Sequence, residues 1–515
     1  MSDLFKNGVV ILDFGSQYTQ LIARRVREHK VYSEILSPES SLDEILQKSP
    51  SAIILSGGPN SVYRNDAPNF DTNILSCHLP IFGICYGLHL LVQSHGGNIV
   101  SEGEGEYGFA ELNVKINRSI LKDIPDSKVW MSHGDRVETL PKNWSVLAES
   151  SNGIVAAIVN SDGTRVATQF HPEVYHTEFG SNIIYNFLFH IADCKPNWTS
   201  ENFIDRQINM IKEQVGSKHV ITGVSGGVDS TVVAALMNKA VGSQAYSIMI
   251  DNGLMRRNEV NNCVSALKKG LNLDIYSYDH SNLFLSKLSG VTDPEKKRKI
   301  IGAQFIHSFE QIAKEFSGIK YLAQGTLYPD VIESGSSKWS TAAVIKSHHN
   351  VGGLPDKINV KIIEPLKELF KDEVREVGKE LGLPTSLINR HPFPGPGLGV
   401  RIIGEITEER VKTLQKADEI YLEILHDDNL YSEIWQAFAV LTPIKTVGVM
   451  GDKRTYENVL VLRAVTSVDG MTANWFPMPY ETLSKISNKI VNSVKGINRV
   501  VYDTTSKPPG TIEWE

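Results

Sequence analysis

The chain has 515 residues, of which 41% are hydrophobic and 22% are charged, and its formal net charge is −7. This composition is typical of a globular protein with a buried core, and the length predicts roughly three domains. The negative charge disfavours a nucleic-acid-binding surface, which needs an excess of lysine and arginine. We expect a cytoplasmic protein without a membrane span or leader, because the apolar runs are short and the four cysteines show no disulfide or zinc spacing.

The first part of the chain alternates short apolar runs with helical patterns. The apolar runs at 9–14, 51–59 and 80–85 predict buried strands, and the pattern of 17–30 predicts a helix. Ser41 and Glu44 have the spacing of a capping box at the start of another helix. This alternation predicts a doubly wound α/β sheet, in which ligands bind at the carboxyl ends of the strands.

Cys85 lies at such an end, within the stretch GICYG, and Gly57 and Gly58 lie at another. Glycines two residues before and after a nucleophile allow a sharp turn from strand to helix, and a helix N-terminus lowers the pKa of a thiol. A lone cysteine is also commonly a small buried apolar residue. This stretch alone leaves both interpretations open.

The stretch QFHPE, residues 169–173, follows an apolar run and the turn sequence NSDG. It predicts His171 and Glu173 at the end of a hairpin strand, where residues two apart face the same side. The carboxylate could then orient an imidazole that accepts the thiol proton. The pair alone would equally suit a solvated loop, but together with Cys85 and the Gly-Gly turn it indicates a Cys-His-Glu hydrolase.

These motifs resemble those of class I glutamine amidotransferases. The resemblance implies that Cys85 attacks the glutamine side-chain amide, that His171 transfers the proton and that Glu173 orients His171. It also implies an oxyanion hole formed by the backbone N–H groups of Gly58 and Tyr86.

Residue 89 departs from the pattern of that family. The family usually has a glutamine four residues after the nucleophile, where it helps to hold the substrate, and this chain has His89. An imidazole lacks the paired donor and acceptor of an amide, so glutamine affinity could be reduced. Alternatively, His89 packs in the helix and another residue replaces the contact. Both interpretations stay open.

A second motif, SGGVDS, follows an apolar run at 219–224 and opens a helical pattern. Backbone N–H groups and a helix N-terminus would converge there on an anion. A glycine turn with an ordinary helix cap is the simpler alternative. The motif resembles the pyrophosphate loop of ATP pyrophosphatases, which implies binding of ATP, with Asp229 as a ligand of Mg²⁺. The implied ATP-binding residues are Val224, Ser225, Gly226, Gly227, Val228, Asp229 and Ser230.

The chain as a whole resembles the glutamine-hydrolysing GMP synthases. The resemblance is carried by WMSHGDRV (130–137), DNGLMRRNE (251–259), KRKIIGAQFI (297–306), AQGTLYPD (323–330), HHNVGGLP (348–355), RHPFPGPGLGVR (390–401) and SKPPGTIEWE (506–515). It implies that ATP adenylylates xanthosine monophosphate (XMP) and that ammonia from glutamine converts the adduct to GMP. It further implies XMP contacts from Arg256, Lys507 and Glu513.

This resemblance also sets the expected architecture. We expect a doubly wound amidotransferase domain at 1–195, a parallel-sheet ATP pyrophosphatase domain at 196–390 and a small α+β domain at 391–515 that forms a homodimer. The glycine-rich segment 348–355 is the candidate for a mobile lid. By composition alone, residues 390–401 are expected to be a proline- and glycine-rich linker. The resemblance instead implies a structured loop flanked by Arg390 and Arg401.

Three rival functions share some of these features. A tRNA-thiolating ATP pyrophosphatase would usually need further reactive cysteines and a basic surface. A regulatory paralogue that does not use glutamine is disfavoured by Cys85, His171 and Glu173. An NAD synthetase shares SGGVDS, but its glutamine-using forms generally carry a different hydrolase domain.

Overall fold

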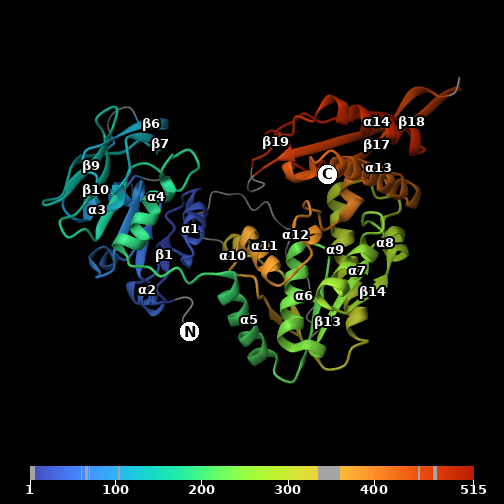
Figure 1. Cartoon of the computed structure of the whole chain (residues 1–515), viewed down its shortest axis with the longest axis horizontal. Coiled ribbons are helices and arrows are strands. Elements are labelled where there is room, and N and C mark those ends of the chain that lie inside the picture. Colours follow the sequence, from blue (N-terminus) through green and yellow to red (C-terminus); the bar gives the residue numbers. More distant parts are fainter. Residues whose placement is uncertain are drawn as a thin grey trace. The chain divides into compact units, whose positions relative to one another are not determined.

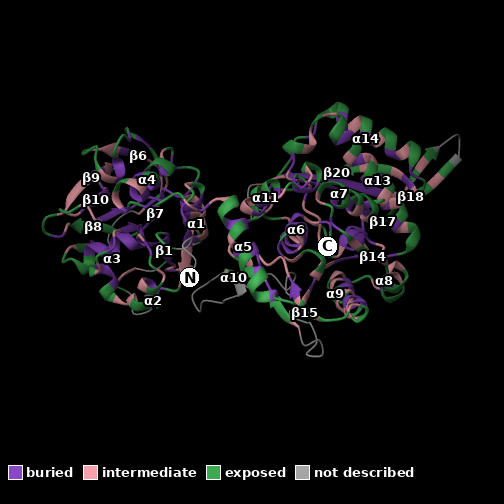
Figure 2. Ribbon diagram, turned by 60° about the horizontal axis from the view of Figure 1, so that its bottom comes forward, coloured by how far each residue is buried: buried purple, intermediate pink, exposed green. Residues whose placement is uncertain are grey.

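The structure is a computed structural model that describes residues 6–59, 61–63, 68, 70–101, 105–334, 360–450, 453–467 and 472–515. The chain divides into two compact units, Met1–Arg206 with Pro329–Ile345, and Gln207–Tyr328 with Lys346–Glu515. Each unit has its own sheets and its own buried core (Figures 1 and 2). The expected lid at 348–355 lies outside the described residues.

The first unit has eleven strands and four complete α-helices among its described residues. The strands are β1 (Val9–Leu12), β2 (Ser33–Leu36), β3 (Ala52–Leu55), β4 (Ile81–Ile84), β5 (Asn98–Val100), β6 (Glu106–Val114), β7 (Ser127–His133), β8 (Arg136–Thr139), β9 (Ser145–Ser150), β10 (Val155–Val159) and β11 (Arg165–Thr168). The helices are α1 (Thr19–Glu28), α2 (Leu42–Gln47), α3 (Tyr86–Ser94) and α4 (Gly180–Tyr185). The division between the units falls within α5 (Ser200–Val215).

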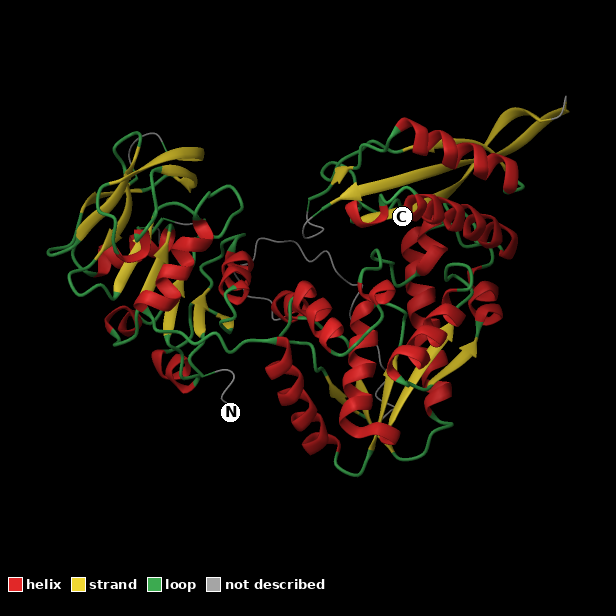
Figure 3. Ribbon diagram, viewed as in Figure 1, coloured by secondary structure: helices red, strands yellow, loops and turns green. Residues whose placement is uncertain are grey.

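Nine of these strands form one sheet in the order β2-β1-β3-β4-β11-β10-β9-β6-β7. The strands from β2 to β11 in this order are parallel, which confirms the predicted doubly wound α/β arrangement, and the following strands are antiparallel. All residues of β1, β3 and β4 are buried, as expected for strands covered on both faces. Figure 3 shows helices packed against the strands.

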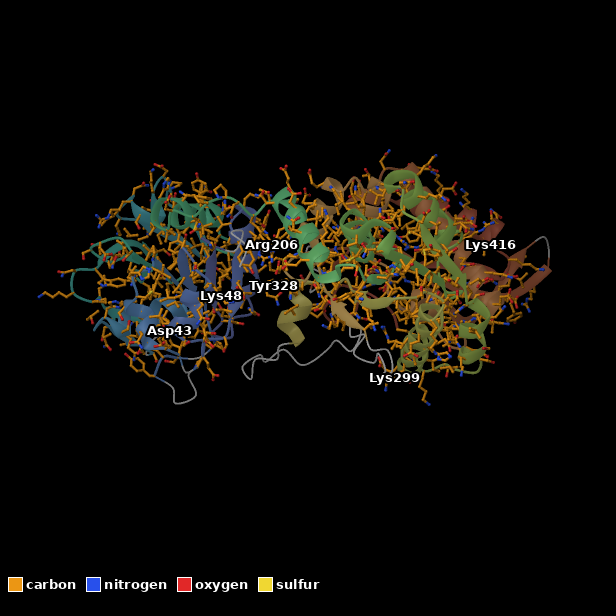
Figure 4. The ribbon with its side chains drawn as sticks, turned by 90° about the horizontal axis from the view of Figure 1, so that it is seen from below. Asp43, Lys48, Arg206, Lys299, Tyr328 and Lys416 are labelled. Atoms are coloured by element: carbon orange, nitrogen blue, oxygen red, sulfur yellow. The ribbon has the colours of Figure 1, made fainter. Side chains whose placement is uncertain are left out.

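The local signals at α2 are confirmed. The Ser41 side chain accepts a hydrogen bond from the Glu44 N–H, and the Glu44 carboxylate accepts one from the Ser41 N–H. The helix buries Ile45 and exposes Asp43 in its first turn (Figure 4). Its acidic first turn also suits the positive end of the helix dipole.

The second unit contains two main sheets. Its strands are β12 (His219–Gly223), β13 (Ala245–Asp251), β14 (Ile275–Asp279), β15 (Ile319–Ala323), β16 (Lys361–Ile363), β17 (Gln436–Met450), β18 (Lys453–Thr466), β19 (Asn474–Trp475) and β20 (Ile497–Tyr502). Its helices are α6 (Val228–Val241), α7 (Glu259–Leu271), α8 (Ser281–Leu288), α9 (Pro294–Ala313), α11 (Lys371–Glu380), α12 (Thr385–Ile388), α13 (Glu408–Asp427) and α14 (Tyr480–Ser493), and α10 (Tyr328–Ser334) begins at its boundary.

The central sheet is parallel throughout, in the order β14-β13-β12-β15-β16, which confirms the predicted parallel sheet. The second sheet joins β17, β18 and β19, with β20 paired to β18. One hydrophobic cluster includes Ile221 and Leu322 of the parallel sheet together with Tyr421 and Leu460 of the C-terminal elements. These elements therefore share a continuous core within the unit.

Two local features of the second unit depend on burial. Strand β17 begins at Gln436, and its residues 436–442 are all buried, so they show no alternation of buried and exposed side chains. Residues 390–401 are a structured loop: residues 398–401 are buried, and the Leu398 N–H donates to the Leu254 carbonyl at 2.7 Å. No described helix is long and apolar enough to cross a membrane.

Candidate active sites

Cys85 joins β4 to α3 in a sharp turn. Its φ of 51° and ψ of −101° are rarely adopted by a residue with a side chain. The flanking glycines allow the close packing of this turn. A Cβ atom on Gly83 would lie 2.5 Å from the Gly87 carbonyl oxygen, and one on Gly87 would lie 2.5 Å from the Leu55 carbonyl oxygen. The turn thus places the thiol at the N-terminus of α3, where the helix dipole favours an anion.

Replacing Gly87 should therefore destabilise the first unit. We expect Gly87→Ala to lower its free energy of unfolding by at least about 2 kcal/mol, because the methyl group meets backbone atoms that cannot rotate away. Thermal unfolding measures this effect. Gly302→Ala is the control, because no atom lies within 4 Å of its added methyl group and alanine favours a helix. A Gly87→Ala protein as stable as the parent would contradict the steric argument.

His171 and Glu173 lie beyond the hairpin strand. Strand β11 ends at Thr168, so the prediction that strand alternation aligns the two side chains is wrong. A turn after the strand aligns them instead, with His171 Nδ1 2.7 Å from Glu173 Oε1. Both residues are buried, and the His171 N–H donates to the Trp130 carbonyl at 3.0 Å. The turn therefore places the His171 imidazole beside the Glu173 carboxylate, which is oriented toward it and shielded from water.

The charge state of His171 follows from these neighbours. Burial lowers its pKa, but the negative charge of Glu173 and a side-chain hydrogen bond with Cys85 outweigh burial and hold the pKa well above 6.5. The raised pKa favours the cationic form of His171. A cationic imidazole beside a thiol stabilises the thiolate, which is the nucleophilic form of cysteine.

The Glu173→Gln variant tests this electrostatic pairing. The amide can still accept from Nδ1 but has no charge, so we expect the pKa of His171 to fall. In the parent, the His171–Glu173 pair contributes its full stabilisation of the fold below pH 6.5, the ordinary pKa of histidine. This stabilisation is lost as the pH rises through the higher pKa that His171 has in the folded protein. Histidine NMR titration measures the shift. An unchanged pKa would show that Glu173 does not set the charge of His171.

The Gly57–Gly58 turn borders the same site. A Cβ atom on Gly57 would lie 3.1 Å from His171 Cε1, and one on Gly58 would lie 3.4 Å from Tyr86 Cγ. Tyr86 is the first residue of α3, so its N–H has no acceptor within the helix. The structure thus brings Gly58 and Tyr86 close to Cys85 and His171.

The loop between β12 and α6 forms the second candidate site. Gly226 has a φ of 79°, which favours glycine. The Ser225 N–H donates to Ser230 Oγ at 3.1 Å, and the Gly227 N–H donates to Ser225 Oγ at 3.4 Å. These internal bonds fix the loop, while the first N–H groups of α6, at residues 228–230, lack acceptors within the helix. This geometry suits a phosphate group.

Asp229 in this loop has one engaged and one unengaged oxygen. Oδ2 accepts a hydrogen bond from Lys371, whereas Oδ1 is buried and has no hydrogen-bond partner among the residues that the structure describes. No group of three or more possible metal-ligating side chains occurs among the described residues. A Mg²⁺ ion that takes Asp229 Oδ1 and completes its shell with phosphate oxygens and water fits this arrangement.

Comparisons with known proteins agree across the chain. The class-I glutamine amidotransferase family model matches residues 10–191, the NAD synthase model matches 200–294, and the GMP synthase C terminal domain model matches 423–514. The glutamine-hydrolysing GMP synthase of Brachyspira hyodysenteriae is 54% identical, over 98% of this chain and 99% of its own. That of Thermosipho africanus is 54% identical, over 99% of this chain and 100% of its own.

The chain belongs to the glutamine-hydrolysing GMP synthase family. In the second unit, three arginines surround Phe393 of the structured loop. The guanidinium carbons of Arg256, Arg390 and Arg401 lie 4.8, 5.5 and 5.1 Å from the centre of the Phe393 ring. Burial, followed by the charges of Arg256 and Arg401, lowers the pKa of Arg390 to about 10. The three guanidinium groups are largely buried, and each pairs with a carboxylate, Asp418, Glu259 and Glu513, respectively.

The arginine cluster connects the other predicted contacts of this GMP synthase. Arg401 donates two hydrogen bonds to Glu513, the shorter at 2.8 Å, and Arg390 donates to the Gly226 carbonyl at 2.8 Å. Arg256 Nη2 and Arg401 Nη1 are buried, and neither has a hydrogen-bond partner within the described part of the chain. Lys507 forms a backbone bridge with Ala473 at the start of the C-terminal tail.

Several residues at these sites were missed by the sequence analysis. Lys371, Asp418 and Gln436 contact Asp229, Arg256 and Glu513, respectively. Gln169 contacts Cys85. Gln169 stands within the quoted QFHPE stretch, so its position offered a signal, whereas the other three lie in ordinary helical or strand patterns far from their partners.

Proposed function

We propose that this GMP synthase hydrolyses glutamine to ammonia, uses ATP to adenylylate XMP, and aminates the adduct to give GMP, AMP and diphosphate. The observation that carries the proposal is that one chain holds both the Cys85–His171–Glu173 arrangement and the phosphate-binding geometry at residues 225–230. One site releases a nucleophile, and the other prepares the electrophile that consumes it.

In the proposed glutamine hydrolysis, Cys85 Sγ attacks the side-chain carbonyl carbon of glutamine. The backbone N–H groups of Gly58 and Tyr86 stabilise the resulting oxyanion. His171 gives its proton to the departing ammonia and then removes a proton from the water that cleaves the thioester. Glu173 keeps Nδ1 of His171 engaged, so that Nε2 is directed toward the reacting groups.

In the proposed synthetase reaction, residues 224–230 bind the phosphates of ATP and retain the diphosphate. Asp229 would hold Mg²⁺, which supplies charge neutralisation at the phosphate oxygens. We propose that Arg256, Lys507 and Glu513 contact XMP. The arginine cluster supports this assignment because it offers buried, unengaged donors to an anion near Glu513.

We further propose three domains at 1–195, 196–390 and 391–515, and each of the three matched family regions falls within one of these ranges. The function needs no nucleic acid or membrane partner, and we propose a cytoplasmic location, where its substrates would be available.

We propose that the C-terminal domain forms a homodimer. The β17–β18–β20 sheet exposes apolar side chains, with Val449, Tyr456 and Ile444 exposed to 74%, 62% and 60%. A second copy of the chain could cover this face. We expect size-exclusion chromatography with light scattering to give twice the monomer mass for the parent and a lower mass for Val449→Lys. A monomeric parent would contradict the proposal.

GMP formation from XMP and Mg-ATP tests the proposed function directly. We expect turnover with glutamine and, separately, with ammonium as the nitrogen donor. If neither donor supports turnover, the proposed function is wrong. If ammonium alone does, the synthetase assignment stands and the glutamine site is impaired.

A further inference from the structure

Gln169 links His89 to the thiol of Cys85. Its side chain is completely buried, directly after β11 and two residues before His171. Gln169 Oε1 lies 2.9 Å from His89 Nε2, and Gln169 Nε2 lies 3.8 Å from Cys85 Sγ. The Gln169 backbone N–H donates to the Ala156 carbonyl at 2.8 Å, which fixes the residue from which this side chain extends.

The protonation of His89 determines the orientation of this amide. Burial lowers the pKa of His89 to about 4, so at neutral pH the ring carries one N–H group. His89 contacts both Gln169 Oε1 and the backbone of Asp135. We assign its single hydrogen to Nε2, where it donates to Gln169 Oε1. The Gln169 NH₂ group is then directed toward the sulfur and can donate to it.

We propose that Gln169 is a catalytic residue whose side-chain N–H donates a hydrogen bond to the Cys85 thiolate. His89 is then the positioning residue that holds the Gln169 amide in this orientation. The proposal rests on the glutamine hydrolysis proposed above and deepens it. It also gives a role to His89. This residue is only 3% exposed, and its Nε2 contacts the side chain of Gln169.

Other titratable groups surround this part of the site from three directions. His171 and Glu173 lie in the turn after β11. His133 and Asp135 lie at the β7–β8 turn, where His133 Nδ1 is 2.9 Å from the Asp135 carbonyl oxygen. Glu106 on β6 lies 3.4 Å from His133 Nε2. Variants of Gln169 keep all of these side chains, so comparison with the parent isolates the contribution of the amide.

The pH dependence of Cys85 alkylation tests the donor role. Iodoacetamide reacts with the thiolate, and mass spectrometry of the peptide containing Cys85 follows this residue alone in the full-length protein. We expect Gln169→Met to alkylate about tenfold more slowly at neutral pH, with its profile displaced about one pH unit upward, because the charged form loses a hydrogen bond. Gln169→Glu should react more slowly still, because its carboxylate repels the thiolate.

Variants of residue 89 test the positioning role. His89→Phe keeps the ring volume but removes the donor, so we expect a displaced alkylation profile in the direction of Gln169→Met. His89→Gln provides an amide N–H that can donate to Gln169 Oε1, and we expect it to restore much of the parent profile. A His89→Phe profile identical to that of the parent would overturn the positioning role.

Gln93→Met is the matched control, because Gln93 lies on α3, the helix that carries His89, but is exposed. Thermal unfolding and ammonium-dependent GMP synthesis show whether each variant is folded. A folded Gln169→Met variant with the parent's alkylation profile would overturn the donor role. If the methionine variant does not fold, a folded Gln169→Glu variant with the parent's profile would overturn it instead. Alkylation requires neither ATP nor XMP, so this result is independent of whether the parent makes GMP.

Discussion

Cys85→Ala should abolish glutamine-dependent GMP synthesis and leave ammonium-dependent synthesis close to the parent rate. The loss should be at least about 10³-fold, because no other nucleophile replaces the sulfur and the tetrahedral intermediate cannot form. Ammonium supplies the nitrogen without this step. Initial rates of GMP formation with each donor, at saturating XMP and Mg-ATP, measure the two activities separately.

Cys77→Ala is the control for this experiment, because Cys77 is a free, half-buried cysteine of the same unit. We expect it to retain both activities. A folded Cys85→Ala protein that loses ammonium-dependent synthesis as well would contradict the proposed division of labour between the two sites. Retention of the glutamine-dependent rate would remove Cys85 from the role of nucleophile.

Asp229→Asn should abolish synthesis with both nitrogen donors. The variant removes the negative charge that pairs with Lys371 and that would attract Mg²⁺ to the free Oδ1. We expect a loss of at least about 10²-fold, because charge stabilisation of a phosphoryl group typically contributes this much to the rate. Formation of AMP and GMP with ammonium as donor measures the effect without involving Cys85.

Asp274→Asn provides a matched control in the second unit, because the Asp274 side chain is 82% exposed and pairs only with an exposed lysine, Lys268, in the structure. We expect its rates to equal those of the parent. Titration of Mg²⁺ separates the two roles of Asp229: a raised magnesium requirement indicates a ligand. An Asp229→Asn protein with the parent's activity and magnesium dependence would contradict the proposed site.

Much of the fold could be predicted because its signals are local. The buried runs of β1, β3 and β4 and the capping box at Ser41 depend on interactions within a few residues. The same holds for the Cys85 turn, where the close approach of Gly83 and Gly87 leaves no room for a side chain. Family resemblance then connected these local features to one architecture, including the parallel central sheet.

The alignment of His171 with Glu173 was predicted for the wrong local reason. The sequence analysis applied strand alternation to residues that follow the end of β11. Strand ends depend on where the neighbouring strand stops providing hydrogen bonds, and β4 pairs with β11 only as far as Ile84 and Thr168. The chain then turns, and this turn forms the short His171–Glu173 contact.

The sequence by itself determined the short-range features: the strand runs, the glycine turns at Cys85 and Gly226, and the family to which the motifs point. Only the tertiary structure decided the partners of residue 89 and of Asp229. Gln169 lies 80 positions after His89 in the sequence, and Lys371 lies 142 positions after Asp229. The physical reason is that steric and hydrogen-bonding preferences act over a few residues, whereas burial brings distant polar groups together and requires them to pair.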